Sequence, residues 1–171
     1  MDGACRPQIV PTAAAAITGN ENACRHAAGN DDGNFGLPAP ANGFDNALDD
    51  ISTCIDHLAP RGPVFVVGYC YGGTLAWMAA CKLGDLAAVS SYYGSQVHNH
   101  AHDVARCPVI LHFGTKDNAI PLAQVEGIIA ARPDLEIHLY EDGHGFNNRD
   151  GAAAHLARRR TLELFEQNGA G

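Results

Sequence analysis

The stretch Val64-Phe65-Val66-Val67-Gly68-Tyr69-Cys70-Tyr71-Gly72-Gly73 joins a short apolar run to a Gly-x-Cys-x-Gly turn, and a helix-like pattern follows from Thr74. This order predicts a strand, a sharp turn and a helix. Glycines on both sides of Cys70 leave room for a strained backbone at which larger side chains would collide. The turn would lift the Cys70 sulfur above the sheet and aim the Tyr71 amide at the charge that forms on an attacked carbonyl. We therefore predict a cysteine nucleophile with Tyr71 as a backbone oxyanion donor, although a cysteine in such a turn also fits a small buried residue.

Strands and helices alternate through the rest of the chain. Residues 64–67 are apolar throughout, which is typical of a parallel strand covered on both faces, whereas the three- and four-residue spacing of apolar side chains in residues 45–58 indicates an amphipathic helix. Similar patterns predict helices and strands in turn at residues 74–83, 87–92, 108–113, 121–131, 136–140 and 152–167. The alternation predicts a parallel sheet whose functional site lies at the carboxyl ends of its strands.

Residues 1–43 carry little that could enter a core. They are rich in Ala, Gly, Asn and Pro, and after Met1 their only larger apolar side chains are Ile9, Val10, Ile17, Phe35 and Leu37. The alanine run in residues 12–18 is short, so we expect at best one or two helical turns there. The predicted organisation is an irregular, poorly ordered segment over residues 1–43, followed by a folded domain over residues 44–171.

Three chemically versatile residues follow three of the predicted strands. Cys70 ends the first strand, Asp117 lies just past the third, and His144 lies just past the fourth. Loops at the carboxyl edge of a parallel sheet open on the same side, so these side chains can converge as a triad. His144 would take the proton of the thiol, whose ordinary pKa is about 8.5, and Asp117 would orient the imidazole. Alone, Asp117 also fits a turn residue and His144 a loop histidine bonded to backbone, but their order and placement together favour acyl transfer.

Four motifs carry a family resemblance: Gly68-Tyr69-Cys70-Tyr71-Gly72-Gly73, Tyr92-Tyr93-Gly94, Gly114-Thr115-Lys116-Asp117 and Gly143-His144-Gly145-Phe146. From about Phe44 to Phe165 the chain resembles the dienelactone hydrolase family of α/β-hydrolases, which are carboxymethylenebutenolidase-like enzymes. The resemblance implies that Cys70, Asp117 and His144 form a triad that opens a small lactone or ester without a metal or cofactor. Tyr93 is expected to line the substrate pocket through its phenol, although an aromatic residue at a strand end also fits core packing.

The first part of the family pattern has no counterpart here. Nothing in residues 1–43 resembles the family's early strands, the loop amide that completes its oxyanion hole, its acidic partner of the resting thiol, or its arginine for a substrate carboxylate. An arginine that the family often places after the histidine has only a loose counterpart in Arg149. The expected fold class is α/β, an α/β-hydrolase-like parallel sheet flanked by helices with the N-terminal strands missing. Two functions stay open: a Cys-dependent hydrolase, or a truncated, catalytically impaired remnant that acts at most as a binding or interaction module.

Composition argues against several other classes. The balance of 11 Lys and Arg against 19 Asp and Glu, a net charge of −8, leaves no basic patch for nucleic acid. No apolar run approaches the roughly 20 residues of a membrane span, and six cysteines without Cys-x-x-Cys spacing favour reduced thiols and a cytoplasmic protein. The run His98-Asn99-His100-Ala101-His102 is more typical of a solvated loop than of a metal site, and none is expected. Arg158, Arg159 and Arg160 are expected on the exposed face of the last helix, and the open sheet edge predicts self-association.

Overall fold

Five parallel strands, in the spatial order β1-β2-β3-β4-β5, form the centre of the described chain. The computed structural model describes residues 13–17 and 43–170. The strands are β1 (Ala13–Ile17), β2 (Val64–Tyr69), β3 (Leu86–Tyr92), β4 (Val109–Gly114) and β5 (Glu136–Tyr140). The α-helices are α2 (Gly43–Leu58), α3 (Tyr71–Lys82), α4 (Leu122–Ala131) and α5 (Ala152–Gln167), and short 3-10 turns are η1 (Ala59–Arg61), η2 (Val97–His100) and η3 (Phe146–Asn148).

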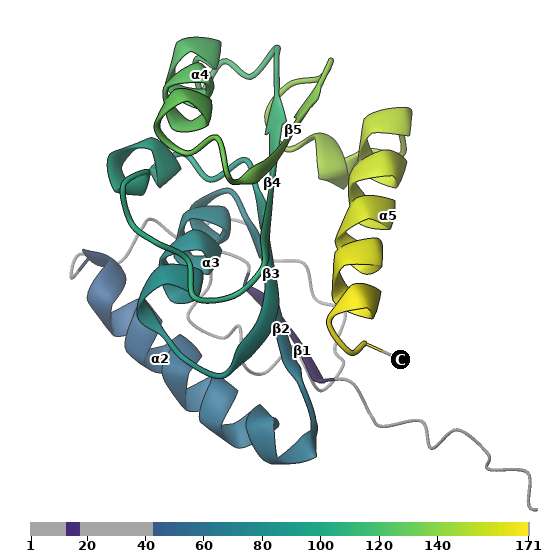
Figure 1. Cartoon of the computed structure of the whole chain (residues 1–171). Coiled ribbons are helices and arrows are strands. Elements are labelled where there is room, and N and C mark those ends of the chain that lie inside the picture. Colours follow the sequence, from purple (N-terminus) through teal and green to yellow (C-terminus); the bar gives the residue numbers. More distant parts are fainter. Residues whose placement is uncertain (1–12, 18–42, 171) are drawn as a thin grey trace, which may run out of the picture.

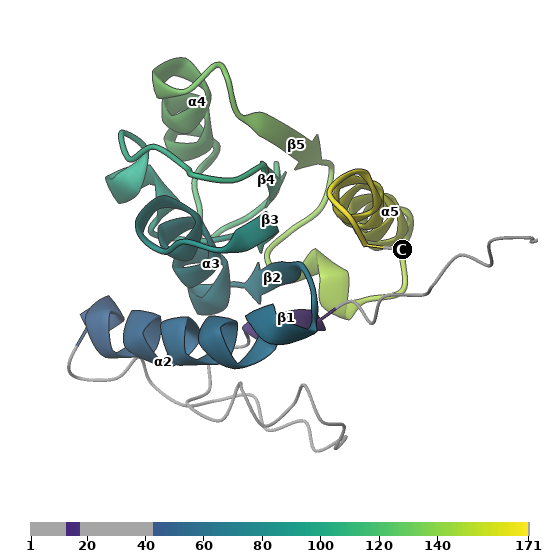
Figure 2. The same cartoon turned by 60° about the horizontal axis from the view of Figure 1, so that its bottom comes forward.

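Helices cover both faces of the sheet, as the alternating pattern predicts. Figures 1 and 2 show α2, α3 and α4 on one face and α5 on the other. Successive strand residues point to opposite faces, so Val64 and Val66 join the larger core under α2 and α3, while Phe65 packs in a smaller cluster with Phe165 of α5. The predicted α/β class, a parallel sheet flanked by helices, is confirmed. The strands and helices predicted from residue 45 onward appear with boundaries shifted by at most three residues.

The amphipathic helix predicted at residues 45–58 is α2. Its apolar stripe is buried at Leu48, Ile51, Ile55 and Leu58. Burying one such aliphatic side chain stabilises a fold by about 1.5–3 kcal/mol relative to leaving it exposed. This stripe therefore fixes α2 against the core that also supports α3, the helix that begins next to Cys70.

Strand β1 is an element that the sequence analysis did not expect. Ala13–Ile17 pairs in parallel with β2, so the prediction of one or two helical turns there is wrong, and one strand does precede α2. A run this short cannot hold as an isolated helix, whereas the edge of β2 offers a row of backbone donors and acceptors that a strand satisfies. The edge strands of the described sheet are consequently β1 and β5. The remainder of the segment predicted to be irregular, residues 1–12 and 18–42, lies outside the described residues.

A buried polar network lies between the sheet and α5. Thr161 Oγ1 is 2.8 Å from Ser90 Oγ, 2.8 Å from the Tyr92 hydroxyl and 3.1 Å from His112 Nε2. His112 Nδ1 is 2.8 Å from the Tyr140 hydroxyl. Buried polar groups are costly unless they are paired, so this network fixes α5 to β3, β4 and β5 just below the edge of the sheet where the loops begin.

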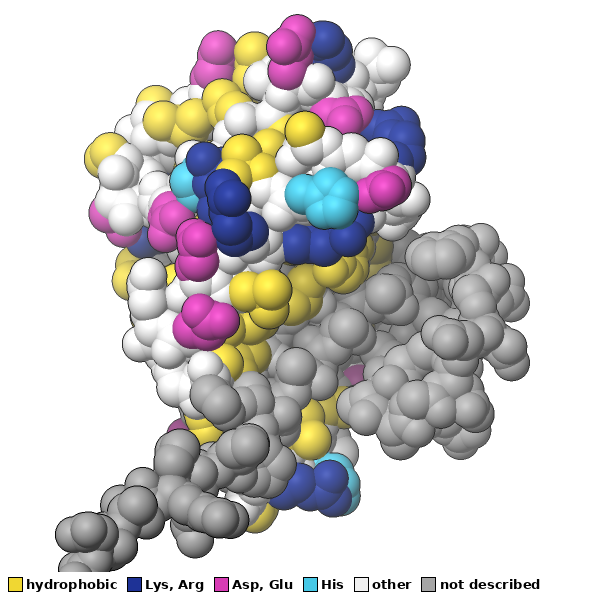
Figure 3. Space-filling view, turned by 90° about the vertical axis from the view of Figure 1, so that its right-hand side faces the viewer, with side chains coloured by type: hydrophobic (Ala, Val, Ile, Leu, Met, Phe, Trp, Pro, Cys, Tyr) yellow, Lys and Arg dark blue, Asp and Glu magenta, His cyan; other side chains and the backbone are white. Residues whose placement is uncertain are grey.

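Helix α5 presents a mixed surface to solvent. Figure 3 looks onto this side of the molecule and shows basic, acidic and hydrophobic side chains interspersed. Arg158 and Arg159 are exposed, as expected. The same expectation is wrong for Arg160, which is half-buried, lies 5.6 Å from the centre of the Tyr140 ring and donates to the Tyr140 hydroxyl at 3.1 Å. A long side chain can cover an aromatic ring while its charged end finds an acceptor.

Two further expectations concern membranes and thiols. Within the described ranges, the structure contains no helix long and apolar enough to cross a bilayer.

Cys54 on α2 is disulfide-bonded, so the expectation of reduced thiols is wrong for this residue, whereas Cys70, Cys81 and Cys107 are free. Sequence spacing missed the bond because disulfide formation depends on which sulfur atoms the fold brings together.

Candidate active site

Cys70 occupies the sharp turn between β2 and α3. Its backbone has φ 54° and ψ −117°, a conformation that non-glycine residues rarely adopt. The surroundings fix this strained residue, because its amide donates to the Tyr92 carbonyl at 3.0 Å and its own carbonyl accepts from the amides of Gly73 and Thr74. Strain of this kind persists only where neighbouring structure enforces it, and it is common at functional sites.

Glycines make the turn sterically possible. A Cβ atom at Gly68 would overlap the carbonyl oxygen of Gly72, and a Cβ at Gly73 would overlap the carbonyl oxygen of Tyr92. The backbones of β2, α3 and β3 therefore approach more closely than any side chain would allow. This close approach is the physical reason for the glycine spacing around Cys70 that the sequence shows.

Asp117 lies in the loop after β4 and uses its two carboxylate oxygens for different partners. Its Oδ1 accepts hydrogen bonds from the amides of Ala119 and Ile120 at 2.8 and 3.0 Å. Its Oδ2 lies 2.8 Å from Nδ1 of His144, and its side chain is only 1% exposed. The turn role and the histidine-orienting role, which the sequence left as alternatives, are thus both present in one side chain.

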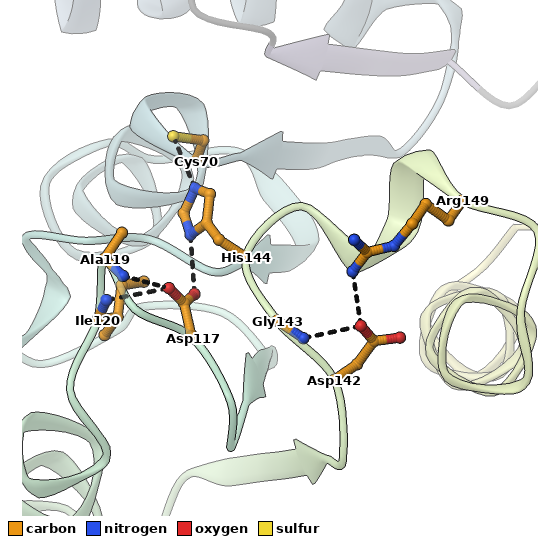
Figure 4. Close-up of polar contacts among 8 residues, drawn as sticks. All are labelled: Cys70, Asp117, Ala119, Ile120, Asp142, Gly143, His144 and Arg149. Carbon is orange, nitrogen blue, oxygen red and sulfur yellow. Dashed lines mark hydrogen bonds and ion pairs between the residues drawn. The ribbon is translucent and has the colours of Figure 1, made fainter.

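His144 bridges the acid and the thiol. Its Nδ1 faces Asp117, while its Nε2 lies 3.2 Å from Cys70 Sγ (Figure 4). Because the carboxylate can only accept, Nδ1 must carry a proton, which leaves Nε2 to exchange a proton with the sulfur. The structure therefore brings together the three side chains that the sequence singled out from three separate loops.

The electrostatics of the Cys70, His144 and Asp117 side chains favour a pair of charges, a thiolate on Cys70 and a protonated imidazole on His144. The hydrogen bond from His144 lowers the pKa of the Cys70 thiol below its ordinary value, although burial opposes the shift. Hydrogen bonds to Cys70 and Asp117 raise the pKa of His144 to about 9. Burial raises the pKa of Cys81 to about 12 and that of Cys107 to about 11. Of these three thiols, Cys70 is the one biased toward the thiolate.

Two tyrosines flank the sulfur. The Tyr71 backbone amide forms a hydrogen bond to Cys70 that helps to lower the thiol pKa, so it points to the reacting side of the residue. Tyr93 has φ 39°, is 1% exposed, and its ring centre lies 5.0 Å from that of His144. The Tyr93 hydroxyl is buried and has no hydrogen-bond partner in the described part of the chain. Both residues that the sequence proposed beside the triad therefore lie next to it.

The loop that carries His144 also contains an ion pair that the sequence analysis did not find. Arg149 Nη2 lies 2.6 Å from Asp142 Oδ1, and the same oxygen accepts from the Gly143 amide at 2.7 Å (Figure 4). The loop is also joined to the acid loop, since the Lys116 amide donates to the Asp142 carbonyl at 3.0 Å. The Asp-Gly dipeptide before His144 was the available signal, because aspartate often bonds the backbone of its own turn.

The histidine-rich run before β4 does not join this site. The indole nitrogen of Trp77 donates to the His100 carbonyl at 3.0 Å, and His100 Nδ1 lies 3.5 Å from Asp103 Oδ2. Across the residues placed by the structure, no group of three or more His, Cys, Asp or Glu side chains is arranged to hold a metal ion.

The sequence of this chain is similar to one protein family and to curated enzymes that share one name. The model of the dienelactone hydrolase family matches residues 37–169. Carboxymethylenebutenolidase 1 of Cupriavidus pinatubonensis is 34% identical over 133 residues, which cover 69% of this chain and 56% of that protein. Carboxymethylenebutenolidase of Pseudomonas putida is 34% identical over 116 residues, covering 61% of this chain and 49% of the relative. The chain thus spans about half the length of these curated relatives.

A more distant structure shares the fold alone. The esterase Pf2001 of Pyrococcus furiosus superimposes with a TM-score of 0.64 at 12% identity, over 73% of this chain and 63% of that chain. At such low identity the likeness concerns the arrangement of the strands and helices, since one fold can host many activities.

Proposed function

The chain belongs to the dienelactone hydrolase family, and from this premise we propose that it hydrolyses a small ester or lactone with Cys70 as nucleophile, His144 as general acid and base, and Asp117 as the residue that orients His144. The observation that carries the proposal is the unbroken line from Cys70 Sγ to His144 Nε2 at 3.2 Å and from His144 Nδ1 to Asp117 Oδ2 at 2.8 Å. A nucleophile, a base and an orienting carboxylate within hydrogen-bond reach are what acyl transfer requires.

Acylation begins when the Cys70 thiolate attacks the carbonyl carbon of the substrate and forms a carbon–sulfur bond. The electron pair of the carbonyl moves to its oxygen, where the Tyr71 amide stabilises the negative charge. As the tetrahedral species collapses, the carbon–oxygen bond of the ester breaks and protonated His144 gives its Nε2 proton to the leaving alkoxide. In a lactone that alkoxide stays attached to the acyl group, so the ring opens.

Deacylation uses water. Neutral His144 takes a proton from a water molecule, whose oxygen attacks the thioester carbon, and the carbon–sulfur bond then breaks to restore the thiolate and the protonated imidazole. Asp117 holds the ring in one tautomer through both steps while its other oxygen stays bonded to the Ala119 and Ile120 amides. No cofactor is needed in this sequence of steps.

The substrate is expected to be compact. The names of the two curated relatives refer to a carboxymethylene-substituted butenolide, a small unsaturated lactone. We expect Tyr93 to form a wall of the pocket, with its unpartnered buried hydroxyl available to a polar group of the substrate. We also propose a cytoplasmic location. In addition, we propose that the protein self-associates through an edge strand of the described sheet, either β1 or β5. Sedimentation at increasing protein concentration would test this self-association.

The direct test is hydrolysis of 4-nitrophenyl acetate and of a small aromatic lactone by the purified protein. Cys70→Ala and His144→Ala should each abolish turnover, while Cys107→Ala, a change to a partly buried free thiol outside the proposed triad, serves as the matched control. The double variant should be no worse than either single variant, because triad members act as a unit. Loss of activity in Cys107→Ala but not in Cys70→Ala would refute the assignment.

A second candidate is a catalytically impaired remnant that serves as a binding or interaction module. It is favoured by the oxyanion donors beside Cys70, since within the described residues the Tyr71 amide is the one donor identified there. Removing one oxyanion donor commonly lowers turnover by about 100- to 1000-fold. A protein whose Cys70 reacts rapidly with iodoacetamide but which turns over neither substrate would support this candidate over the hydrolase.

A further inference from the structure

In the described part of the chain, strand β5 has one row of backbone groups with no partner strand. It is an edge of the sheet, and Figures 1 and 2 show it at the margin with α4 on one side and α5 on the other. The Thr115 amide donates to the Tyr140 carbonyl at 2.7 Å, so the backbone of Tyr140 points toward β4. Alternate residues of a strand direct their backbone groups to opposite sides. The amides and carbonyls of Ile137 and Leu139 therefore point outward, away from β4.

The two faces of β5 carry different side chains. Leu139 is paired with Phe113 of β4, which lies in the larger core cluster, yet the Leu139 side chain is 42% exposed. Ile137 is partly buried against the same cluster. On the opposite face, Glu136 Oε1 lies 2.8 Å from His138 Nε2, and these side chains are 53% and 23% exposed. The edge thus presents apolar side chains on one face and an acid and an imidazole on the other.

This edge is complementary to itself when two copies of β5 run antiparallel. Across such a junction, the residues whose backbone groups point outward exchange the hydrogen bonds. If Ile137 lies opposite Ile137 of the second copy, Glu136 lies opposite His138 of the second copy, and the twofold axis repeats this pair. Leu139 then lies opposite Leu135 of the second copy, another side chain that packs against the larger core. The two neighbouring registers would instead place Glu136 opposite Glu136 or His138 opposite His138.

Charge complementarity therefore selects both the occupant and the register. A carboxylate and an imidazole can share a hydrogen bond whether or not the imidazole is protonated. Opposite charges that face each other across antiparallel strands are worth up to about fivefold in an equilibrium, and like charges are unfavourable. Edge strands are often protected from pairing by lysine or proline, whereas β5, with the sequence EIHLY, contains neither. A strand of five residues forms a small interface, so the association is expected to be weak and reversible.

We propose that the free edge of β5 is a self-recognition surface, at which two copies of this chain pair antiparallel with Ile137 opposite Ile137 and form one continuous sheet. The inference rests on the self-association proposed above, and it names the edge and the register. Hydrolysis does not enter it, because residues 135–139 include no member of the proposed triad.

Sedimentation velocity at increasing protein concentration measures the dissociation constant of the dimer. Leu139→Lys introduces on the edge the residue type that commonly blocks strand pairing. Leu162→Lys is the matched control, since it makes the same change at a leucine of α5 that is 59% exposed. Leu139→Lys should raise the dissociation constant by at least about tenfold, while Leu162→Lys changes it by less than about twofold.

Disulfide cross-linking tests the register. A mixture of the Glu136→Cys and His138→Cys proteins, oxidised with copper phenanthroline, should form a disulfide between positions 136 and 138 of different chains. These positions would form a non-hydrogen-bonded pair with Cα atoms about 4.5 Å apart, which a disulfide can span. Each variant alone should cross-link much less, because neither position faces its own copy. Peptide mapping identifies the bond, and wild type, in which Cys70 is exposed, gives the background.

The outcomes separate the possible failures. A wild-type protein that stays monomeric at every concentration would refute self-association itself, and this inference with it. A dimer that Leu139→Lys leaves intact, or that Leu162→Lys weakens equally, would overturn the assignment to β5 and favour the β1 edge. Stronger cross-linking in either variant alone than in the mixture would overturn the register. The hydrolase function is decided separately, by turnover of 4-nitrophenyl acetate.

Discussion

Replacing His112 by glutamine should flatten the acid dependence of stability. His112 is fully buried, and burial together with the charges of His138 and Arg160 lowers its pKa to about 3 from an ordinary value of 6.5. A neutral ring can accept from the Tyr140 hydroxyl at Nδ1 and donate from Nε2 to Thr161. A protonated ring has no acceptor and would leave the Tyr140 hydroxyl without a place for its proton.

The size of the effect follows from proton linkage. Because the folded pKa of His112 lies below the unfolded one, the stability that it contributes is present above about pH 6.5 and is lost as the pH falls toward about 3. Between pH 7 and pH 5 the unfolded chain gains about 0.7 of a proton at this site and the folded chain almost none, which lowers the free energy of unfolding by about 2 kcal/mol. His144 contributes with the opposite sign over this range, since its folded pKa is raised to about 9. The informative quantity is therefore the difference between wild type and variant.

Urea unfolding at pH 7, 6 and 5 measures that difference. His112→Gln should be less stable than wild type at pH 7 by about 1–3 kcal/mol, because a buried hydrogen-bond network is disturbed, and the gap should shrink by about 2 kcal/mol at pH 5. His102→Gln, a change at an exposed histidine, is the control and should run parallel to wild type. A gap between wild type and His112→Gln that stays constant within about 0.5 kcal/mol across this range would refute the reasoning.

Three further predictions concern the candidate site. Iodoacetamide at neutral pH should alkylate Cys70 well before Cys81. The pKa of the Cys70 thiol is lowered, so more of it is thiolate at neutral pH, whereas the pKa of Cys81 is raised to about 12. Peptide mapping of the labelled protein shows which cysteine reacts first. Asp117→Asn should lower kcat by at least about 100-fold and shift the pKa of His144 downward from about 9, which NMR titration of the imidazole would follow; an unchanged titration would contradict the contact. Gly68→Ala should destabilise the fold by about 3 kcal/mol or more, since the new Cβ would overlap a backbone carbonyl; a urea midpoint equal to that of wild type would show that the turn can relax.

The sequence predicted best those features that depend on local patterning. The apolar spacing in residues 45–58 correctly predicted helix α2, and the alternation of strands and helices correctly predicted that the strands of the sheet are parallel. The contact among Cys70, Asp117 and His144 could also be predicted, but from the sheet topology and not from any local pattern. Loops at the carboxyl ends of parallel strands lie on the same edge of the sheet.

Features that depend on distant partners were missed. β1 is a strand because β2 offers an edge to pair with, and no alanine run reports the presence of such an edge. Likewise, the half-buried state of Arg160 depends on Tyr140, and the disulfide of Cys54 depends on three-dimensional approach. The Asp142–Arg149 pair joins residues seven positions apart across η3, a separation with no helical or strand periodicity to reveal it.

The strained turn at Cys70 makes the thiol an internal reporter of folding. Cys81 is buried at 7% exposure, so folding shields it, whereas Cys70 is exposed and acquires its histidine partner only when β2, α3 and the loop after β5 are assembled. In the unfolded chain both are ordinary thiols with similar reactivity. A pulse of alkylating reagent during refolding would therefore see one cysteine become slower and the other faster. The time at which the alkylation rate of Cys70 rises therefore measures when the loop that carries His144 packs beside it. The time at which the alkylation rate of Cys81 falls measures, separately, when Cys81 is buried.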